Sequence, residues 1–355
     1  MMGKRYIRIA CFTPRGRELA ERLMASWEEY IPLRRRREES LEEWAAEGFR
    51  MHQPLLFVGA AGIALRTVAP LVQDKLQDSP VLVMDERGNH IIPLLSGHMG
   101  GANALAREIG ARIGANPAIT TATDVNGCFA IDDFARRNGL RIGNREAIRR
   151  VSGKLLSGKK ILLRSTVPAE FSGRVPENVV LRQPGDGAAE DASIPDGIIG
   201  FPEAEAPKEC LTLIPRKLVV GMGCRKGVPF EKLKEFLERV LEEEGLQPED
   251  IRCIASVDRK AGEPGLIQLA QYCRVPYRLF TPAELERVSG EFPESEFVRR
   301  TVGTGNVCQR AAAAAAAAAG GGRVRRGKTA MDGMTLCIVE QEKWHFQWQP
   351  ERNEM

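Results

Sequence analysis

The sequence predicts an α/β protein with two α/β domains, whose sheets are largely parallel, joined by a small middle module or linker. Short apolar runs of strand length alternate with amphipathic helical stretches, which is typical of parallel sheets covered by helices. Glycine-bearing turns follow three of the expected strands. The chain has 355 residues, more than one domain usually holds. We therefore expect an N-terminal domain over residues 1–135, a middle module and linker over 136–212, and a C-terminal domain over 213–345.

In the N-terminal domain, apolar runs and helical periodicity alternate along the chain. We expect strands over 6–12, 54–58, 81–84, 91–95 and 118–121. Helices are expected over 19–27, 63–71 and 102–113. The cluster of four arginines from Arg34 to Arg37 is followed at once by two glutamates, so we interpret it as a solvated helix face.

The composition changes between residues 168 and 209, a stretch rich in proline, glycine and acidic residues. Such a stretch is typical of a linker or of a small, loop-rich module. Strand-like runs over 161–163 and 179–181 keep the second option open.

The C-terminal domain resumes the alternation. Strands are expected over 218–220, 251–256 and 335–339, and helices after Phe230 and over 266–273. The nine alanines from Ala311 to Ala319 favour a helix of small residues packed closely on a sheet, because alanine has the highest helix propensity.

Composition and charge exclude several classes of protein. Lys and Arg number 51 and Asp and Glu 47, a net charge of only +4, which argues against a nucleic-acid binder. No run approaches the roughly 20 apolar residues of a membrane helix, and no signal peptide is visible, so we expect a cytoplasmic protein that binds no membrane. The eight cysteines form no CxxC pair, which predicts neither a zinc site nor a redox pair.

Three turns carry the glycines that could bind a ligand. They are Gly59 to Gly62, Ser96 to Asn103 and Gly221 to Gly227. Glycine lets a backbone approach a ligand, and the following helix N-terminus offers N–H groups to an anion. Each turn could equally be a tight strand-to-helix connection. Three of them, expected at the same edge of α/β sheets, favour a ligand rich in anionic groups. A nucleotide is disfavoured, because GxGxxxG is one residue too long for the dinucleotide fingerprint and GxxxxGK[ST] does not occur.

His98 is the leading candidate for proton transfer, since a side chain within a glycine turn can face a cleft. Asp85 and Asp124 each end an apolar run, where functional groups of α/β proteins collect, although aspartate there can also cap a turn. Ser96 and His98 with either aspartate could imitate a nucleophilic triad, but no GxSxG elbow is present.

Several strings resemble the cobalt-precorrin-5A hydrolases, the CbiG family of anaerobic cobalamin synthesis. In the N-terminal half these are the strings 59–70, 94–103 and 119–124, of which Leu-Ser-Gly-His-x-Gly-Gly-Ala-Asn is highly specific. In the C-terminal half they are 220–227, 255–258, 296–298 and 303–308. The departures are modest: Ala60 and Ala61 stand where a larger residue and a threonine are expected, and poly-alanine replaces a mixed helix.

The resemblance implies an enzyme that opens the δ-lactone of cobalt-precorrin-5A and releases acetaldehyde to give cobalt-precorrin-5B. It implies no cofactor of the protein's own, because cobalt enters with the substrate, and it makes neighbouring methyltransferases of the pathway candidate partners. The residues expected to bind this corrinoid are Gly59, Gly62, Arg66, Ser96, Gly97, Gly100, Gly101, Asn103, Gly221, Gly223, Cys224, Arg225, Lys226, Ser256, Gly303 and Gly305.

Within that resemblance, we expect His98 to deprotonate a water that attacks the lactone carbonyl. Backbone N–H groups near Gly100 and Gly101 would stabilise the oxyanion. Asp124 or Asp85 would orient His98 or accept the alcohol proton, and the residues do not decide between them. The alternative function is a non-catalytic protein that binds the tetrapyrrole and hands it over, which would release no acetaldehyde.

Overall fold

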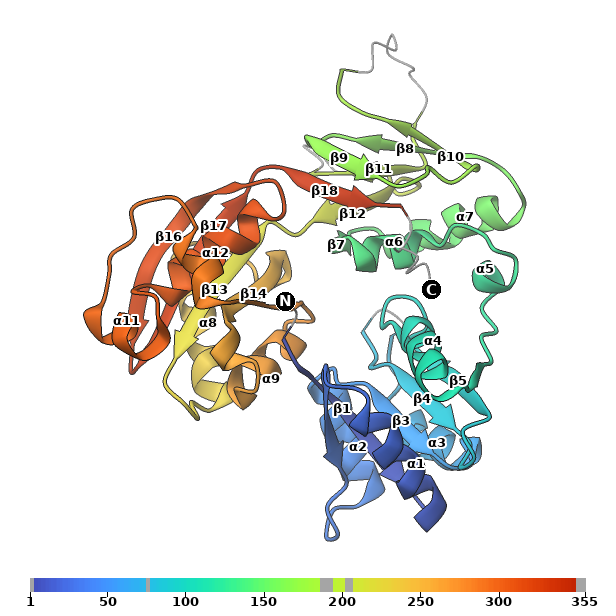
Figure 1. The fold of residues 1–355 in the computed structure, drawn as a ribbon. Coiled ribbons are helices and arrows are strands. Elements are labelled where there is room, and N and C mark those ends of the chain that lie inside the picture. The colour runs from blue at the N-terminus through green and yellow to red at the C-terminus, as the bar shows by residue number, and fades with distance from the viewer. Residues whose placement is uncertain (1–2, 75–76, 186–193, 202–206, 349–355) are drawn as a thin grey trace. The chain divides into compact units, whose positions relative to one another are not determined.

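The computed structural model describes residues 3–74, 77–185, 194–201 and 207–348 (Figure 1). The chain divides into two compact units. The first holds residues up to 121 together with 226–234 and 260–277, and the second holds 122–225, 235–259 and the chain from 278 onward. No helix of the described residues is long and apolar enough to cross a membrane.

The first unit contains a six-stranded sheet with the order β2-β1-β3-β4-β5-β6. Its strands are β1 (Arg5–Cys11), β2 (Tyr30–Arg34), β3 (Leu55–Val58), β4 (Val81–Met84), β5 (His90–Leu95) and β6 (Asn116–Pro117). Its helices are α1 (Pro14–Ala25), α2 (Leu41–Arg50), α3 (Ala61–Val68) and α4 (Ala102–Ile113). Neighbouring strands are parallel except β4 and β5, which form an antiparallel hairpin.

Helices pack on both faces of this sheet and thereby bury its central strands on both sides. In β3 and β4, Leu56 and Leu82 pack in one cluster with residues of α1 and α4. The alternate residues Leu55 and Val81 pack in another cluster with residues of α2 and α3. This three-layer arrangement confirms the predicted α/β class for the N-terminal part.

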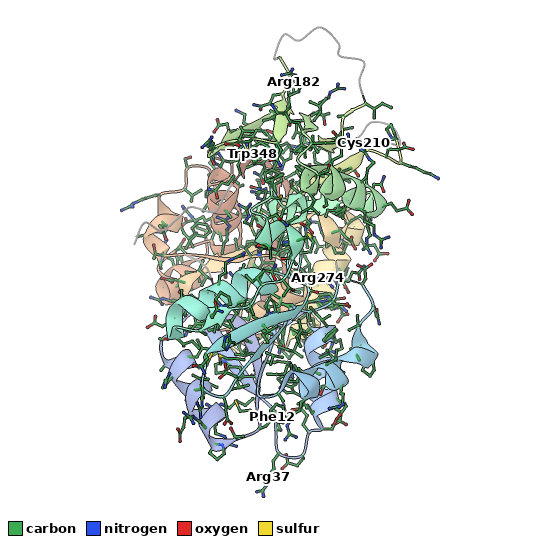
Figure 2. All side chains as sticks on the ribbon, turned by 90° about the vertical axis from the view of Figure 1, so that its right-hand side faces the viewer. Phe12, Arg37, Arg182, Cys210, Arg274 and Trp348 are labelled. Carbon is green, nitrogen blue, oxygen red and sulfur yellow. The ribbon has the colours of Figure 1, made fainter. Side chains whose placement is uncertain are left out.

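Two expectations for this region were wrong, and two elements were not expected. Strand β2 and helix α2 have no counterpart among the expected elements, and the strand expected over 118–121 is replaced by the two-residue β6. The cluster Arg34 to Arg37 does not lie on a helix: Arg34 ends β2, whose backbone pairs with β1. The three following arginines are exposed in the loop before α2, and Figure 2 shows Arg37 at its tip.

The middle of the chain forms a sheet of its own in the second unit. Five strands lie in the order β10 (Val179–Arg182), β8 (Ile161–Ser165), β11 (Gly197–Ile199), β12 (Leu211–Pro215) and β7 (Leu140–Ile142). Helices α5 (Ala122–Val125), α6 (Ile131–Arg137) and α7 (Arg145–Leu156) precede or separate them. Strand β9 (Ala169–Ser172) pairs with β18 (Trp344–Gln347). Of the predicted middle region, 186–193 and 202–206 lie outside the described residues.

The C-terminal sheet has the order β15 (Tyr277–Phe280), β14 (Ile251–Val257), β13 (Leu218–Cys224), β17 (Met334–Gln341) and β16 (Gly322–Met331). Strands β13 and β14 are parallel, whereas β17 is antiparallel to both β13 and β16. The helices in this part are α8 (Phe230–Glu243), α9 (Pro264–Tyr272), α10 (Pro282–Glu286), α11 (Glu296–Val302) and α12 (Val307–Ala317).

Helix α12 contains most of the alanine run, and its close packing on the sheet confirms the prediction. Ala311, Ala312, Ala315 and Ala316 are buried in one cluster with residues of β13, β14 and β17. At the closest approach, a Cβ on Gly221 would lie 1.8 Å from the carbonyl oxygen of Cys308. No side chain fits there, so glycine at 221 is a packing requirement of the helix.

The segment 260–277 is held within the first unit by hydrogen bonds to distant parts of the chain. The Gln271 side chain donates to the Tyr6 carbonyl at 2.9 Å. The buried Glu263 carboxylate accepts the Gly227 N–H at 2.6 Å and pairs with Lys260 at 2.8 Å. These contacts tie the turn after β13 to the chain that precedes α9.

Arg274, labelled in Figure 2, joins two further loops of the first unit. Its guanidinium donates to the Gln77 carbonyl at 2.6 Å and to the ring of His52 at 2.7 Å. Burial, together with the charge of Arg274, lowers the pKa of His52 to about 4. A neutral imidazole can accept from the guanidinium, so this contact requires His52 to stay unprotonated.

We predict that His52 makes the protein lose stability as the pH falls from about 6.5 to about 4. In this window the unfolded chain protonates His52 and the folded chain does not, so the free energy of unfolding decreases as the pH falls. Because the side chain is only half-buried, we expect His52→Asn to remove on the order of 1 kcal/mol of this loss. Denaturant titrations at several pH values measure it, with the exposed histidine variant His90→Asn as control. Parallel stability curves for wild type and His52→Asn would contradict the assignment.

Candidate functional site

The string with the most specific sequence signal forms the turn between β5 and α4. Ser96 has a φ of 55° and Gly101 a φ of 85°, so the chain passes twice through the left-handed region before α4 begins. The Ser96 hydroxyl donates to the Asp78 carbonyl at 2.8 Å and fixes the start of the turn to the preceding loop. His98 lies half-buried at the centre of the turn.

Two glycines of the turn leave no room for a side chain. A Cβ on Gly97 would lie 2.7 Å from the Asn103 side-chain oxygen, and one on Gly100 would lie 2.4 Å from the Cβ of Ser96. Asn103 itself is only 3% exposed and donates to the Thr121 hydroxyl at 3.0 Å. Gly97, Gly100 and Asn103, all expected to bind substrate, therefore also build the turn that carries His98.

Most of the backbone N–H groups at the start of α4 are already used. The N–H of Gly101 donates to the His98 carbonyl, that of Ala102 to Ser96, and that of Asn103 to Gly97, at 3.0, 3.1 and 3.0 Å. They are not available to an oxyanion in this conformation. Gly101 is thereby removed from the expected oxyanion donors, which leaves the exposed Gly100.

The Gly59 turn lies at the opposite edge of the sheet, so the expectation of one shared edge was wrong for this unit. Gly59 follows the carboxyl end of β3 and donates to the Met84 carbonyl at 2.9 Å. Because β5 runs antiparallel to β4, Leu95 pairs with Val81 at the other end of that strand. The four residues of β4 separate the two turns by about 13 Å.

Asp85 lies at the Gly59 edge, where it caps the β4–β5 hairpin. Its carboxylate accepts the backbone N–H groups of Arg87 and His90 at 2.9 and 2.6 Å. Burial alone would raise the pKa of Asp85, but these backbone donors hold it below its usual value. The same strand length that separates the two turns separates Asp85 from His98, so Asp85 does not orient this histidine.

Arg66, on the helix that follows the Gly59 turn, is a charged group available to a ligand. It is exposed on α3, and its guanidinium makes no hydrogen bond or ion pair with another described residue. Gly62, in the first turn of the same helix, is also exposed. Asp124, the other expected carboxylate, lies on the short helix α5 in the second unit and is half-buried.

In the C-terminal sheet, several expected binding residues have packing roles. Gly221 and Gly223 do not break β13 as expected; the strand continues to Cys224. A Cβ on Gly223 would lie 2.8 Å from the Thr335 hydroxyl, and the buried Ser256 hydroxyl donates to the Met222 carbonyl at 2.7 Å. These contacts hold neighbouring strands together and leave the Ser256 hydroxyl proton engaged.

The loop before α12 is likewise shaped by its own contacts. Gly303 has a φ of 91°, and a Cβ on Gly305 would lie 2.6 Å from the Glu294 carboxylate. Asn306 caps the helix by accepting the N–H of Gln309 at 3.1 Å. The string 303–308 therefore sets how α12 begins, which explains its glycines without a ligand.

The turn that does follow β13 exposes two cations. The N–H of Arg225 donates to the Gly333 carbonyl at 3.0 Å, so the turn is anchored through its backbone to the β16–β17 hairpin. The side chains of Arg225 and Lys226 are exposed and pair with no residue that the structure describes, while Cys224 before them is half-buried. Unpaired guanidinium and ammonium groups at a strand end suit the carboxylates of a polyanionic ligand.

The supports of the His98 turn include contacts that no local sequence signal could reveal. The Ser96 hydroxyl donates to the Asp78 carbonyl. The Arg274 guanidinium, nearly 200 residues away in the sequence, donates to the carbonyl of the adjacent Gln77. Around the turn and elsewhere, the described residues contain no group of three His, Cys, Asp or Glu side chains that could hold a metal ion.

Comparison with known proteins assigns both halves of the chain. Residues 43–124 match the model of the N-terminal domain of cobalamin synthesis protein G, and residues 218–339 match the model of its C-terminal domain. The cobalt-precorrin-5A hydrolase of Salmonella typhimurium is 40% identical over 326 residues, covering 86% of this chain and 90% of that protein. A second cobalt-precorrin-5A hydrolase, from Priestia megaterium, is 28% identical over 275 residues, which cover 74% of this chain and 73% of that protein.

A solved structure covers almost the whole chain. The cobalamin biosynthesis protein G homologue of Sulfolobus solfataricus covers 96% of this chain and 98% of its own, at 22% identity and a TM-score of 0.41. The family assignment rests instead on the two domain matches and on the Salmonella relative. On those grounds, this chain belongs to the cobalamin synthesis G family.

Proposed function

We propose that this protein is a cobalt-precorrin-5A hydrolase, which opens the δ-lactone of its substrate, releases acetaldehyde and forms cobalt-precorrin-5B. The observation that carries the proposal is the 40% identity to the Salmonella enzyme over most of both chains. The region of the His98 turn lies within the N-terminal domain match and that of Arg225 within the C-terminal one. Cobalt enters with the substrate, so the chain supplies acid–base groups and charge rather than a cofactor.

The first step we assign to His98. Its imidazole takes a proton from water as the water oxygen attacks the lactone carbonyl, and the ring C–O bond then breaks to give a carboxylate and an alcohol. The N–H of the exposed residue Gly100 is the donor that we propose for the transient oxyanion. The close packing of Gly97 and Gly100 against Asn103 and Ser96 supports this role, because it restricts where His98 can move.

Substrate recognition we assign to the unpaired cations. The substrate carries acetate and propionate side chains, and Arg225 offers a planar guanidinium that can bind one of them with two hydrogen bonds. Lys226 and Arg66 would bind others as exposed charges. We also propose neighbouring methyltransferases of the pathway as partners. We propose the cytoplasm as the compartment in which the protein acts.

The function is tested with purified protein and cobalt-precorrin-5A. We expect acetaldehyde and a corrinoid that has lost the two-carbon fragment, in equal amounts, measured by trapping the aldehyde and by mass spectrometry. A protein that only carries the tetrapyrrole would bind the corrinoid and return it unchanged. If the protein binds the corrinoid tightly but releases no acetaldehyde, the hydrolase assignment is wrong and the protein is a carrier.

His98→Ala should slow the reaction by ~10²–10⁴ while substrate affinity changes little, since a general base acts in the transition state. The matched control is His90→Ala, an exposed histidine at the other end of β5. Steady-state kinetics separate the outcomes. A raised KM with an unchanged kcat in a folded His98→Ala protein would make His98 a binding residue only.

Arg225→Ala should weaken corrinoid binding by about 1.5–3 kcal/mol, the range for hydrogen bonds to charged groups. Fold and stability should be unaffected, because the side chain is exposed and the turn is anchored through backbone atoms. Equilibrium titration with substrate measures the change, and Arg182→Ala, at the exposed end of β10, is the control. Equal affinity in wild type and Arg225→Ala would remove this arginine from the site.

A further inference from the structure

A carboxylate lies beside the Arg225 turn that none of the roles above uses. Strands β13 and β14 are parallel, with Gly221 opposite Ala255. Asp258 is the first residue after β14, where the chain enters a short 3-10 helix (Asp258–Lys260), and Cys224 is the last residue of β13. Asp258 is thus at the carboxyl edge of two adjacent parallel strands, where α/β proteins bind their ligands.

The environment of Asp258 is unusual for a charged side chain. The residue is half-buried, and its Oδ1 is covered from solvent and has no hydrogen-bond partner among the residues that the structure describes. Nor does an ion pair with any described cation compensate it. Such a carboxylate oxygen has lost its hydrogen bonds to water and has gained none from the protein. Folded proteins rarely contain such a group without a functional reason.

The neighbouring groups show that this is not a simple packing defect. Two residues earlier, the Ser256 hydroxyl is fixed on the Met222 carbonyl, so the strand end is rigid. Arg225 follows Cys224 directly, yet its exposed guanidinium does not pair with Asp258. Among the described residues, this edge therefore presents unpaired cations and one unpaired carboxylate, which suits a ligand that has both a carboxylate and a hydroxyl group.

We propose that Asp258 is a catalytic residue that removes the hydroxyl proton of the two-carbon fragment, a role that rests on the proposed function. Lactone opening leaves a 1-hydroxyethyl group on the macrocycle. The Asp258 carboxylate takes its O–H proton, and the oxygen electrons form the carbonyl of acetaldehyde. The carbon–carbon bond to the macrocycle breaks, and its electron pair enters the conjugated ring system. A proton then returns to the macrocycle, so the step needs no oxidant or reductant.

The test is Asp258→Asn, which keeps the shape of the side chain and removes its basicity. With cobalt-precorrin-5A, this variant should still open the lactone and should accumulate an acid heavier than the substrate by one water. Acetaldehyde release should fall at least 100-fold at saturating substrate, while corrinoid affinity stays within about threefold. Its melting temperature should equal or exceed that of wild type, because an uncompensated charge is removed.

The matched control is Asp250→Asn, just before the other end of β14, which should release acetaldehyde like wild type. Release at the wild-type rate by Asp258→Asn would overturn the assignment, and so would a loss of stability with no accumulated acid, which marks a structural role. If wild type itself releases no acetaldehyde, the proposed function fails instead, so the two failures are distinguishable.

Discussion

The direction of β5 decides which loops of the first unit can act together. This strand runs antiparallel to β4. An all-parallel sheet would have gathered the Gly59 turn, Asp85 and the His98 turn at one edge. The reversal instead brings the His98 turn beside the loop that leads into β4, where Ser96 binds the Asp78 carbonyl. The Arg274 guanidinium donates a hydrogen bond to the Gln77 carbonyl of the same loop. A segment nearly 200 residues away in the sequence therefore supports the loop that contacts the His98 turn.

Most residues of the family-specific strings serve the fold before they serve a ligand. The missing side chain of Gly221 lets α12 pack closely on the sheet, and Asn103 packs against Gly97 of the His98 turn and donates to Thr121. Ser256 links β14 to β13 by a hydrogen bond. A substitution at these positions would therefore disturb the backbone that carries the site. Among the charged groups of these strings, those with unused bonding capacity in the described chain include the exposed Arg66, Arg225 and Lys226 and the half-buried Asp258. A highly specific motif therefore marks the rigid frame of a site as much as its chemistry.

The alternation of short apolar runs and amphipathic helices was enough to predict the α/β class and the alanine-rich helix on its sheet. It could not predict β2, because residues 30–34 form a strand only through pairing with β1. Nor could it predict the direction of β5, since an antiparallel strand has the same local pattern as a parallel one. His98 and Arg225 could be singled out from their glycine-rich surroundings. The contacts of Arg274 with Gln77 and His52 could not, because partners so far apart in sequence leave no local signal.

Three carboxylates in the connections that follow strands show why position alone does not identify a catalytic group. Asp85 is saturated by backbone N–H groups of its hairpin, and Glu263 by the Gly227 N–H and the Lys260 ammonium. For Asp85, these backbone donors hold the pKa below its usual value, which makes it a poor proton acceptor. Asp258 alone among these three has no such donor in the described chain. Its Oδ1 therefore keeps lone pairs that no described donor occupies, and the hydroxyl group of a bound ligand could supply that donor.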